Sequence, residues 1–155
     1  MTIEEKADFL RKEARTKLAC GEQFPNLLIA YSDKQSIQCG VDIGGEEDKR
    51  NFILATKVFF RLHDIHSYIY VVNGFSLHAE QVTPQEFNEI LETGKISHLQ
   101  QTNNCIVIGT ITKEKKDMVA IVYRQLSTGK IEVLKEEKHN VKEDLAGIFN
   151  TLLEE

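Results

Sequence analysis

The stretch of residues 48–73, DKRNFILATKVFFRLHDIHSYIYVVN, constrains the fold of this chain more than any other stretch. Its first part has apolar residues at mixed three- and four-residue spacings, which is typical of one broad apolar helical face. Residues 68–72, YIYVV, are β-branched and aromatic, and they precede the turn pair Asn73-Gly74, which indicates a strand. We therefore expect a central helix, followed by a strand buried on both faces, around which the other elements pack.

The expected core combines this stretch with later strands. A single core is predicted because a chain of 155 residues has the usual size of one domain. Its expected members are Phe52, Val58, Phe59, Tyr70, Val72, Ile106, Ile108 and Val122.

Composition narrows the class of protein. A hydrophobic share of 41% with 28% charged residues is ordinary for a globular protein and argues against extended disorder. The longest apolar runs are far shorter than the ~20 residues of a membrane-spanning helix, and residues 1–10 lack the order of a signal peptide. Three scattered cysteines form no disulfide framework, which favours a reducing compartment. A cytosolic protein with no membrane contact is expected.

The charge distribution disfavours nucleic acid as a partner. The formal net charge is −5, and the chain has no long basic block. Lys113, Lys115 and Lys116 form the main lysine cluster, but Glu114 interrupts it and Asp117 follows it. This pattern is typical of an exposed turn between two strands.

The N-terminal part predicts a helix followed by a hairpin. Thr2 and Glu5 have the spacing of a capping box at the start of an amphipathic helix over residues 2–18. Residues 26–32 and 36–43 read as two strands that pair across residues 33–35. The second strand alternates apolar and polar residues, so Cys39 is expected in the core.

The C-terminal part predicts a short helix, three strands and a final helix. Thr83-Pro84 is a helix start, and the helix is expected to end before Gly94. Residues 105–112, 118–126 and 130–135 are separated by turn sequences, which indicates an antiparallel meander. Asn140 is the expected start of the last helix. Residues 75–79 either continue the preceding strand or turn back beside it.

This order of elements predicts an α+β fold in a single domain, residues 1–155. Helices alternate with strands in the first half of the chain and a meander follows. We therefore expect a mixed β-sheet with a C-terminal antiparallel meander and about four packed helices.

A histidine cluster is the main candidate for chemistry. His63 and His66 are three residues apart near the end of the central helix, so they would point to one side. Two neutral imidazoles with a third ligand can hold a divalent metal ion, and His78 or Asp42 could supply that ligand. The alternative is that these histidines only interact with the helix end and a loop. The strong zinc pattern H-E-x-x-H is absent from the sequence.

Other catalytic patterns have little support. Cys39 and Cys105 lie in apolar strands, where cysteines are usually inert core residues. The chain has no phosphate-binding loop, dinucleotide fingerprint or G-x-S-x-G sequence, and no cofactor is expected.

Two functions follow from these patterns. The first is a small cytosolic binding or regulatory protein that acts through protein–protein contacts, including self-association as a homodimer, because caps and turns account for most polar residues. The second is a metal-dependent hydrolase with a His/Asp site around the end of the central helix.

Overall fold

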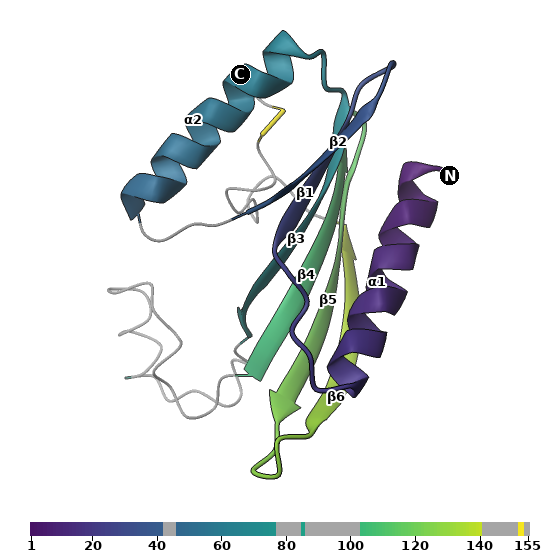
Figure 1. Cartoon of the computed structure of the whole chain (residues 1–155), viewed down its shortest axis with the longest axis vertical. Helices are drawn as coiled ribbons and strands as arrows, with labels where there is room; N and C mark the ends of the chain where they lie inside the picture. Colours follow the sequence, from purple (N-terminus) through teal and green to yellow (C-terminus); the bar gives the residue numbers. More distant parts are fainter. Residues whose placement is uncertain (42–45, 77–84, 86–102, 141–151, 154–155) are drawn as a thin grey trace.

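The computed structural model describes residues 1–41, 46–76, 85, 103–140 and 152–153. Its centre is a six-stranded sheet in the order β2-β1-β3-β4-β5-β6, in which all neighbouring strands are antiparallel (Figure 1). The elements are α1 (Ile3–Ala19), β1 (Leu27–Tyr31), β2 (Ser36–Gly40), α2 (Glu46–Leu62), β3 (Ser67–Ser76), β4 (Asn103–Thr112), β5 (Lys116–Gln125) and β6 (Ile131–Asn140).

The expectation of a mixed sheet is wrong, although α+β remains a fair description of the class. A helix between two strands usually indicates a crossover to a parallel neighbour. Here α2 returns the chain over β1, so β3 pairs with β1 and not with β2. Both neighbours of β1 are therefore antiparallel to it.

The expectation of about four packed helices is also wrong, because the described residues contain two helices and form a mostly-sheet fold. The helix predicted for residues 83–93 lies outside the described residues except for Gln85. Asn140, the predicted start of the last helix, is the final residue of β6, and residues 141–151 lie outside the described residues.

Helix α1 covers one face of the sheet as its apolar spacing predicts. Thr2 caps the helix, since its Oγ1 accepts a hydrogen bond from the Glu5 backbone N–H at 3.1 Å. Leu10, Ala14 and Leu18 are buried against the sheet. The strand residues in this core are Leu27, Ile29, Ile69, Val71, Ile106, Ile108, Ile121 and Tyr123.

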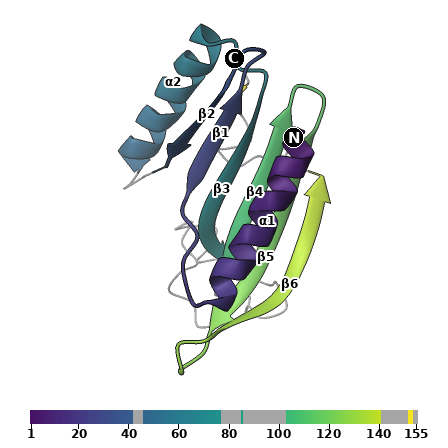
Figure 2. The ribbon, with the colours of Figure 1, turned by 45° about the vertical axis from the view of Figure 1, so that its right-hand side comes forward.

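Helix α2 lies on the opposite face (Figures 1 and 2). Phe60 is 3% exposed, and its ring centroid lies 5.2 Å from that of Tyr68, which is fully buried. Tyr68 and Tyr70 belong to this second core, whereas Ile69 and Val71 belong to the first. The central strand is thus buried on both faces as predicted, but it separates two cores where a single core was expected.

The predicted core face of the central helix is rotated from the observed one. Val58 is 54% exposed and Phe59 is only partly buried, whereas Phe60 and Thr56 are buried. Leu62 is 75% exposed. The helix carries apolar residues on both sides, so periodicity alone did not identify the side that faces the sheet.

The first hairpin is confirmed, with Ala30 opposite Ile37. Cys39 is exposed, so the prediction that it lies in the core is wrong. The reason is its position: β2 is one of the two edge strands of the sheet, and the residues of β2 are exposed or only partly buried.

The predicted meander is confirmed by β4, β5 and β6. The first turn closes where the Thr112 backbone N–H donates to the Lys115 carbonyl at 2.9 Å. Strand β3 continues to Ser76, which shows that Phe75 extends the strand. Neither described helix is both long and apolar enough to cross a membrane.

Candidate functional site

The end of α2 has a backbone motif that explains the position of Asp64, which follows the predicted site residue His63. Asp64 has φ of 52°, in the left-handed region. Its N–H donates to the Arg61 carbonyl at 3.4 Å, and the Ile65 N–H donates to the Phe60 carbonyl at 2.9 Å. This pair of bonds is a Schellman motif, which satisfies the last helical carbonyls. Asp64 therefore has a structural role in ending the helix.

The two predicted metal-binding histidines have separate surroundings. The exposed His63 ring lies against Phe59, with 4.4 Å between ring centroids. His66 lies beyond the helix, where its backbone N–H donates to the Tyr31 carbonyl at 3.0 Å. The expectation that both lie on the last turn is wrong because α2 ends at Leu62.

His66 joins a polar chain with Ser67 and Asp33. The distance from its Nδ1 to Ser67 Oγ is 2.9 Å, and that from its Nε2 to Asp33 Oδ1 is 3.4 Å. These residue types also occur in hydrolase triads. However, Ser67 is 5% exposed, whereas the Asp33 side chain is 98% exposed. A buried hydroxyl cannot reach a substrate, and a fully solvated carboxylate orients an imidazole poorly. We therefore interpret these three side chains as a structural link between the β1–β2 hairpin and β3.

The proposed metal ligands Asp42 and His78 lie outside the described residues. Within the described part of the chain, no group of three His, Cys, Asp or Glu side chains could hold a metal ion. The four-residue site of Asp42, His63, His66 and His78 therefore stays a prediction.

A cavity of about 540 Å³ lies beside the end of α2, at the location where the sequence predicted a site. Apolar residues contribute to its wall, among them Phe60, Ile65 and Leu152. Its charged lining is mixed, with Asp33, Lys57, Arg61, Asp64 and Lys113 around it. The cavity is a surface recess bordered by cations on α2 and on the β4–β5 turn.

The outer side of α2 carries an apolar row that sequence analysis did not single out. Leu54, Val58 and Leu62 are 65%, 54% and 75% exposed. They follow one another at four-residue spacing, so they lie on successive turns of one side. Buried Thr56 is two residues from both Leu54 and Val58, which places the sheet-facing side nearly opposite. We call Leu54, Val58 and Leu62 the outer row.

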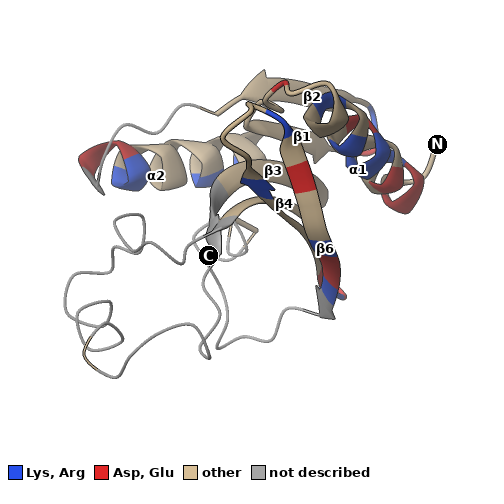
Figure 3. Ribbon diagram, turned by 90° about the horizontal axis from the view of Figure 1, so that it is seen from below, with Lys and Arg blue, Asp and Glu red and all other residues tan. Residues whose placement is uncertain are grey.

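Basic side chains border the outer row. Arg50, Lys57 and Arg61 are spaced by seven and four residues, so they follow one flank of the helix. Among the described residues, none of these three cations forms an ion pair. In Figure 3, parts of the α2 ribbon beyond its acidic N-terminal end are coloured as lysine or arginine positions. We call Arg50, Lys57 and Arg61 the basic flank.

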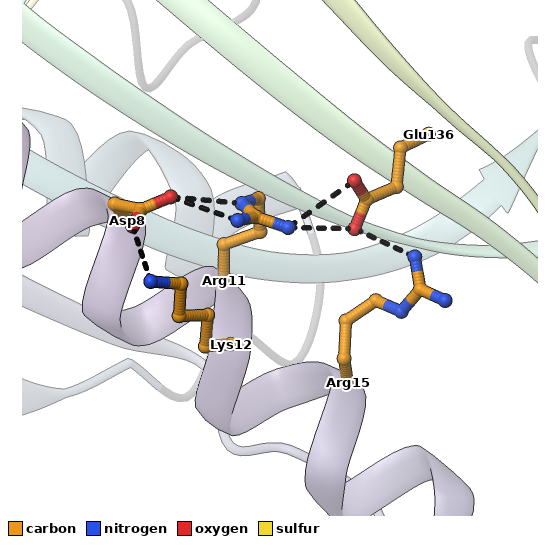
Figure 4. Close-up of polar contacts among 5 residues, drawn as sticks. All are labelled: Asp8, Arg11, Lys12, Arg15 and Glu136. Atoms are coloured by element: carbon orange, nitrogen blue, oxygen red, sulfur yellow. Dashed lines mark hydrogen bonds and ion pairs between the residues drawn. The ribbon is translucent and has the colours of Figure 1, made fainter.

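A second cavity, of about 500 Å³, lies between α1 and the sheet. Its lining includes Ala7, Ile108 and Val119, with Asp8 and Arg11 among its charged residues. Arg11 Nη2 donates to Asp8 Oδ1 at 2.9 Å, and Arg11 Nη1 donates to both Glu136 oxygens at 3.3 Å (Figure 4).

This ion network joins α1 to the edge strand β6. Arg15 Nη1 also lies 3.1 Å from Glu136 Oε1, and Lys12 Nζ lies 3.1 Å from Asp8 Oδ2. Hydrogen bonds from Arg11 and Lys12 hold the pKa of Asp8 below its usual value. Because its charges are already paired, we interpret the network as a structural connection between α1 and the sheet.

The cysteines give no sign of a nucleophile. Cys105 is buried, as predicted, while Cys20 and Cys39 are exposed. Partial desolvation of the Cys39 thiol raises its pKa, and this lowers the thiolate fraction at neutral pH.

Comparison with known proteins adds no assignment. The chain matches no protein-family model, no curated protein and no solved structure.

Proposed function

We propose that this chain is a small cytosolic binding or regulatory protein that acts through protein–protein contacts. The observation that supports the proposal is the outer row on α2. Three large apolar side chains at four-residue spacing match the anchor pattern of a helix that packs into a groove or against another helix. Exposed apolar side chains that form a continuous row are typical of interaction sites, whereas single exposed ones are ordinary.

Helix α2 supports this proposal because its sheet-facing side is already occupied. Phe60 packs on Tyr68 there, with Phe52 and Ile53 partly buried beside it. The outer row makes no contribution to that core. Its apolar surface would be stabilised by a partner through burial, at about 25 cal/mol for each Å² removed from water.

The test compares association of the wild-type chain with that of Val58→Asp. We expect the wild-type chain to form a saturable complex, with itself or with a second protein, in analytical ultracentrifugation. The Val58→Asp change places a charge in the middle of the contact and should abolish the complex. The control is Leu134→Asp on β6, because Leu134 is also exposed, at 39%, but is distant in the chain from the outer row. A complex that survives Val58→Asp would contradict the proposal.

A further inference from the structure

We propose that the partner of α2 is an amphipathic helix with acidic residues along one flank. This inference rests on the function proposed above and adds the chemistry of the partner. The outer row would take the apolar face of that helix, and the basic flank would pair with its carboxylates. The cations of Arg50, Lys57 and Arg61 stand out because the whole chain has a formal net charge of −5.

The choice of an acidic partner rests on charge complementarity with the basic flank. None of the three basic-flank cations forms an ion pair with a described residue, so their charges are available to a partner. Lys57 and Arg61 also border the cavity beside α2, whose charged lining includes Lys113 as well as the carboxylates of Asp33 and Asp64. A partner carboxylate that lies over the basic flank itself would meet the cations of α2. Opposite charges across an interface increase the association rate and reject partners of like charge.

A second copy of the chain fits this surface less well. In a two-fold pair of antiparallel helices, each flank meets its own counterpart. The basic flank of one copy would then face the basic flank of the other, with like charges opposed. Only the apolar contacts of the outer row would stabilise such a dimer, and the charge repulsion between the two basic flanks would oppose it.

An anionic membrane surface is also disfavoured by the charges on the same side of the helix. Glu47 is exposed and lies seven residues before Leu54, about two helical turns away on the same side. A carboxylate there would be repelled by anionic lipid headgroups. A protein helix can accommodate Glu47 by placing a polar or basic residue opposite it.

The experiment uses the full chain and two synthetic helical peptides. Both peptides have leucines at four-residue spacing, and one flank carries glutamate in the first peptide and lysine in the second. We expect the glutamate peptide to bind at least about tenfold more tightly than the lysine peptide in fluorescence anisotropy at low salt. The double change Lys57→Glu with Arg61→Glu should reverse this preference. The control double change is Lys130→Glu with Lys138→Glu, which alters the charge equally at two exposed lysines of the β5–β6 hairpin.

The outcomes separate this inference from the proposed function. One outcome is that Val58→Asp loses peptide binding while the charge-reversed variant keeps the wild-type preference. This outcome would overturn the inference of an acidic partner, and the outer row would remain as a docking site. Binding that is insensitive to both changes would overturn both proposals. A dimer that Val58→Asp disrupts, with no peptide binding, would identify a second copy and overturn the inference. Binding to phosphatidylserine-containing vesicles without peptide binding would also overturn it.

Discussion

Tyr70 on β3 lies directly over Gly109 on β4. The two residues are cross-strand partners in the antiparallel pairing of these strands. A Cβ atom built on Gly109 would overlap the Cε1 and Cζ atoms of the Tyr70 ring. Tyr70 is 3% exposed and belongs to the core beneath α2, so its ring has little room to move. Glycine is needed at position 109 because the tyrosine ring fills the space of its side chain.

Replacement of Gly109 by alanine should therefore destabilise the fold by overpacking. We expect Gly109→Ala to lower the free energy of unfolding by about 1 to 3 kcal/mol, measured by urea denaturation. Gly40→Ala is the matched control, because Gly40 also lies in a strand and a Cβ there would meet nothing within 4 Å. Equal effects of the two changes would show that the Tyr70 ring can move aside.

The two neighbouring phenylalanines of α2 should differ strongly in their contribution to stability. Phe60→Ala should cost about 3 to 5 kcal/mol, because Phe60 is 3% exposed and packs on Tyr68. Phe59→Ala should cost clearly less, because Phe59 is only partly buried and lies against the exposed His63 ring. Thermal and urea unfolding of both variants would measure the difference. A larger loss for Phe59→Ala would mean that α2 has the orientation expected from the sequence.

Local patterns predicted local structure well. The capping residue Thr2, the hairpin between β1 and β2, the strand YIYVV and the meander all follow from interactions between residues close in sequence. The order of the strands in the sheet could not be predicted in this way, because no local sequence pattern indicates that α2 crosses over β1 and brings β3 beside it. Cys39 was misplaced for the same reason: alternation predicts one buried face, but an edge strand has fewer neighbours to cover it.

The metal site expected around the end of the central helix stays a prediction, because Asp42 and His78 lie outside the described residues. The sequence drew attention to the loop after the central helix, and a cavity does lie there. Its polar residues, however, are engaged in ending the helix and linking the hairpin, as Asp64 and His66 show. The apolar spacing of Leu54, Val58 and Leu62 can be read from the sequence, but Val58 was expected in the core, and it is 54% exposed. Two apolar sides on one helix were the signal for a second contact surface.

Asp64 offers a test of the motif that ends α2. Asp64→Val should destabilise the fold by about 1 to 2 kcal/mol, because a β-branched residue is strained at φ of 52°. Asp64→Gly should cause no loss, since glycine adopts this conformation without strain, as Gly21 does just after the end of α1 with φ of 74°. Urea unfolding of the two variants would measure the difference. Similar stability of the two would show that the helix end relaxes to another conformation.

The ion network between α1 and β6 predicts a dependence of stability on pH through Asp8. Hydrogen bonds from Arg11 and Lys12 lower the pKa of Asp8 from its usual value of 3.8. In the folded state Asp8 therefore binds a proton less readily than in the unfolded state. Its stabilising contribution is complete above the usual pKa, and it is lost as the pH falls through the lower folded-state pKa.

Asp8→Asn should remove this pH-dependent contribution. The wild-type chain should be more stable than Asp8→Asn at neutral pH, and the difference should shrink between about pH 5 and pH 2. Urea midpoints measured across this range would follow it, and added salt should reduce the difference because Asp8 is at the surface. Glu13→Gln on the exposed side of α1 is the control for the loss of one surface carboxylate. A wild-type advantage that stays constant with pH would mean that Asp8 acts through packing or helix propensity and not through its charge.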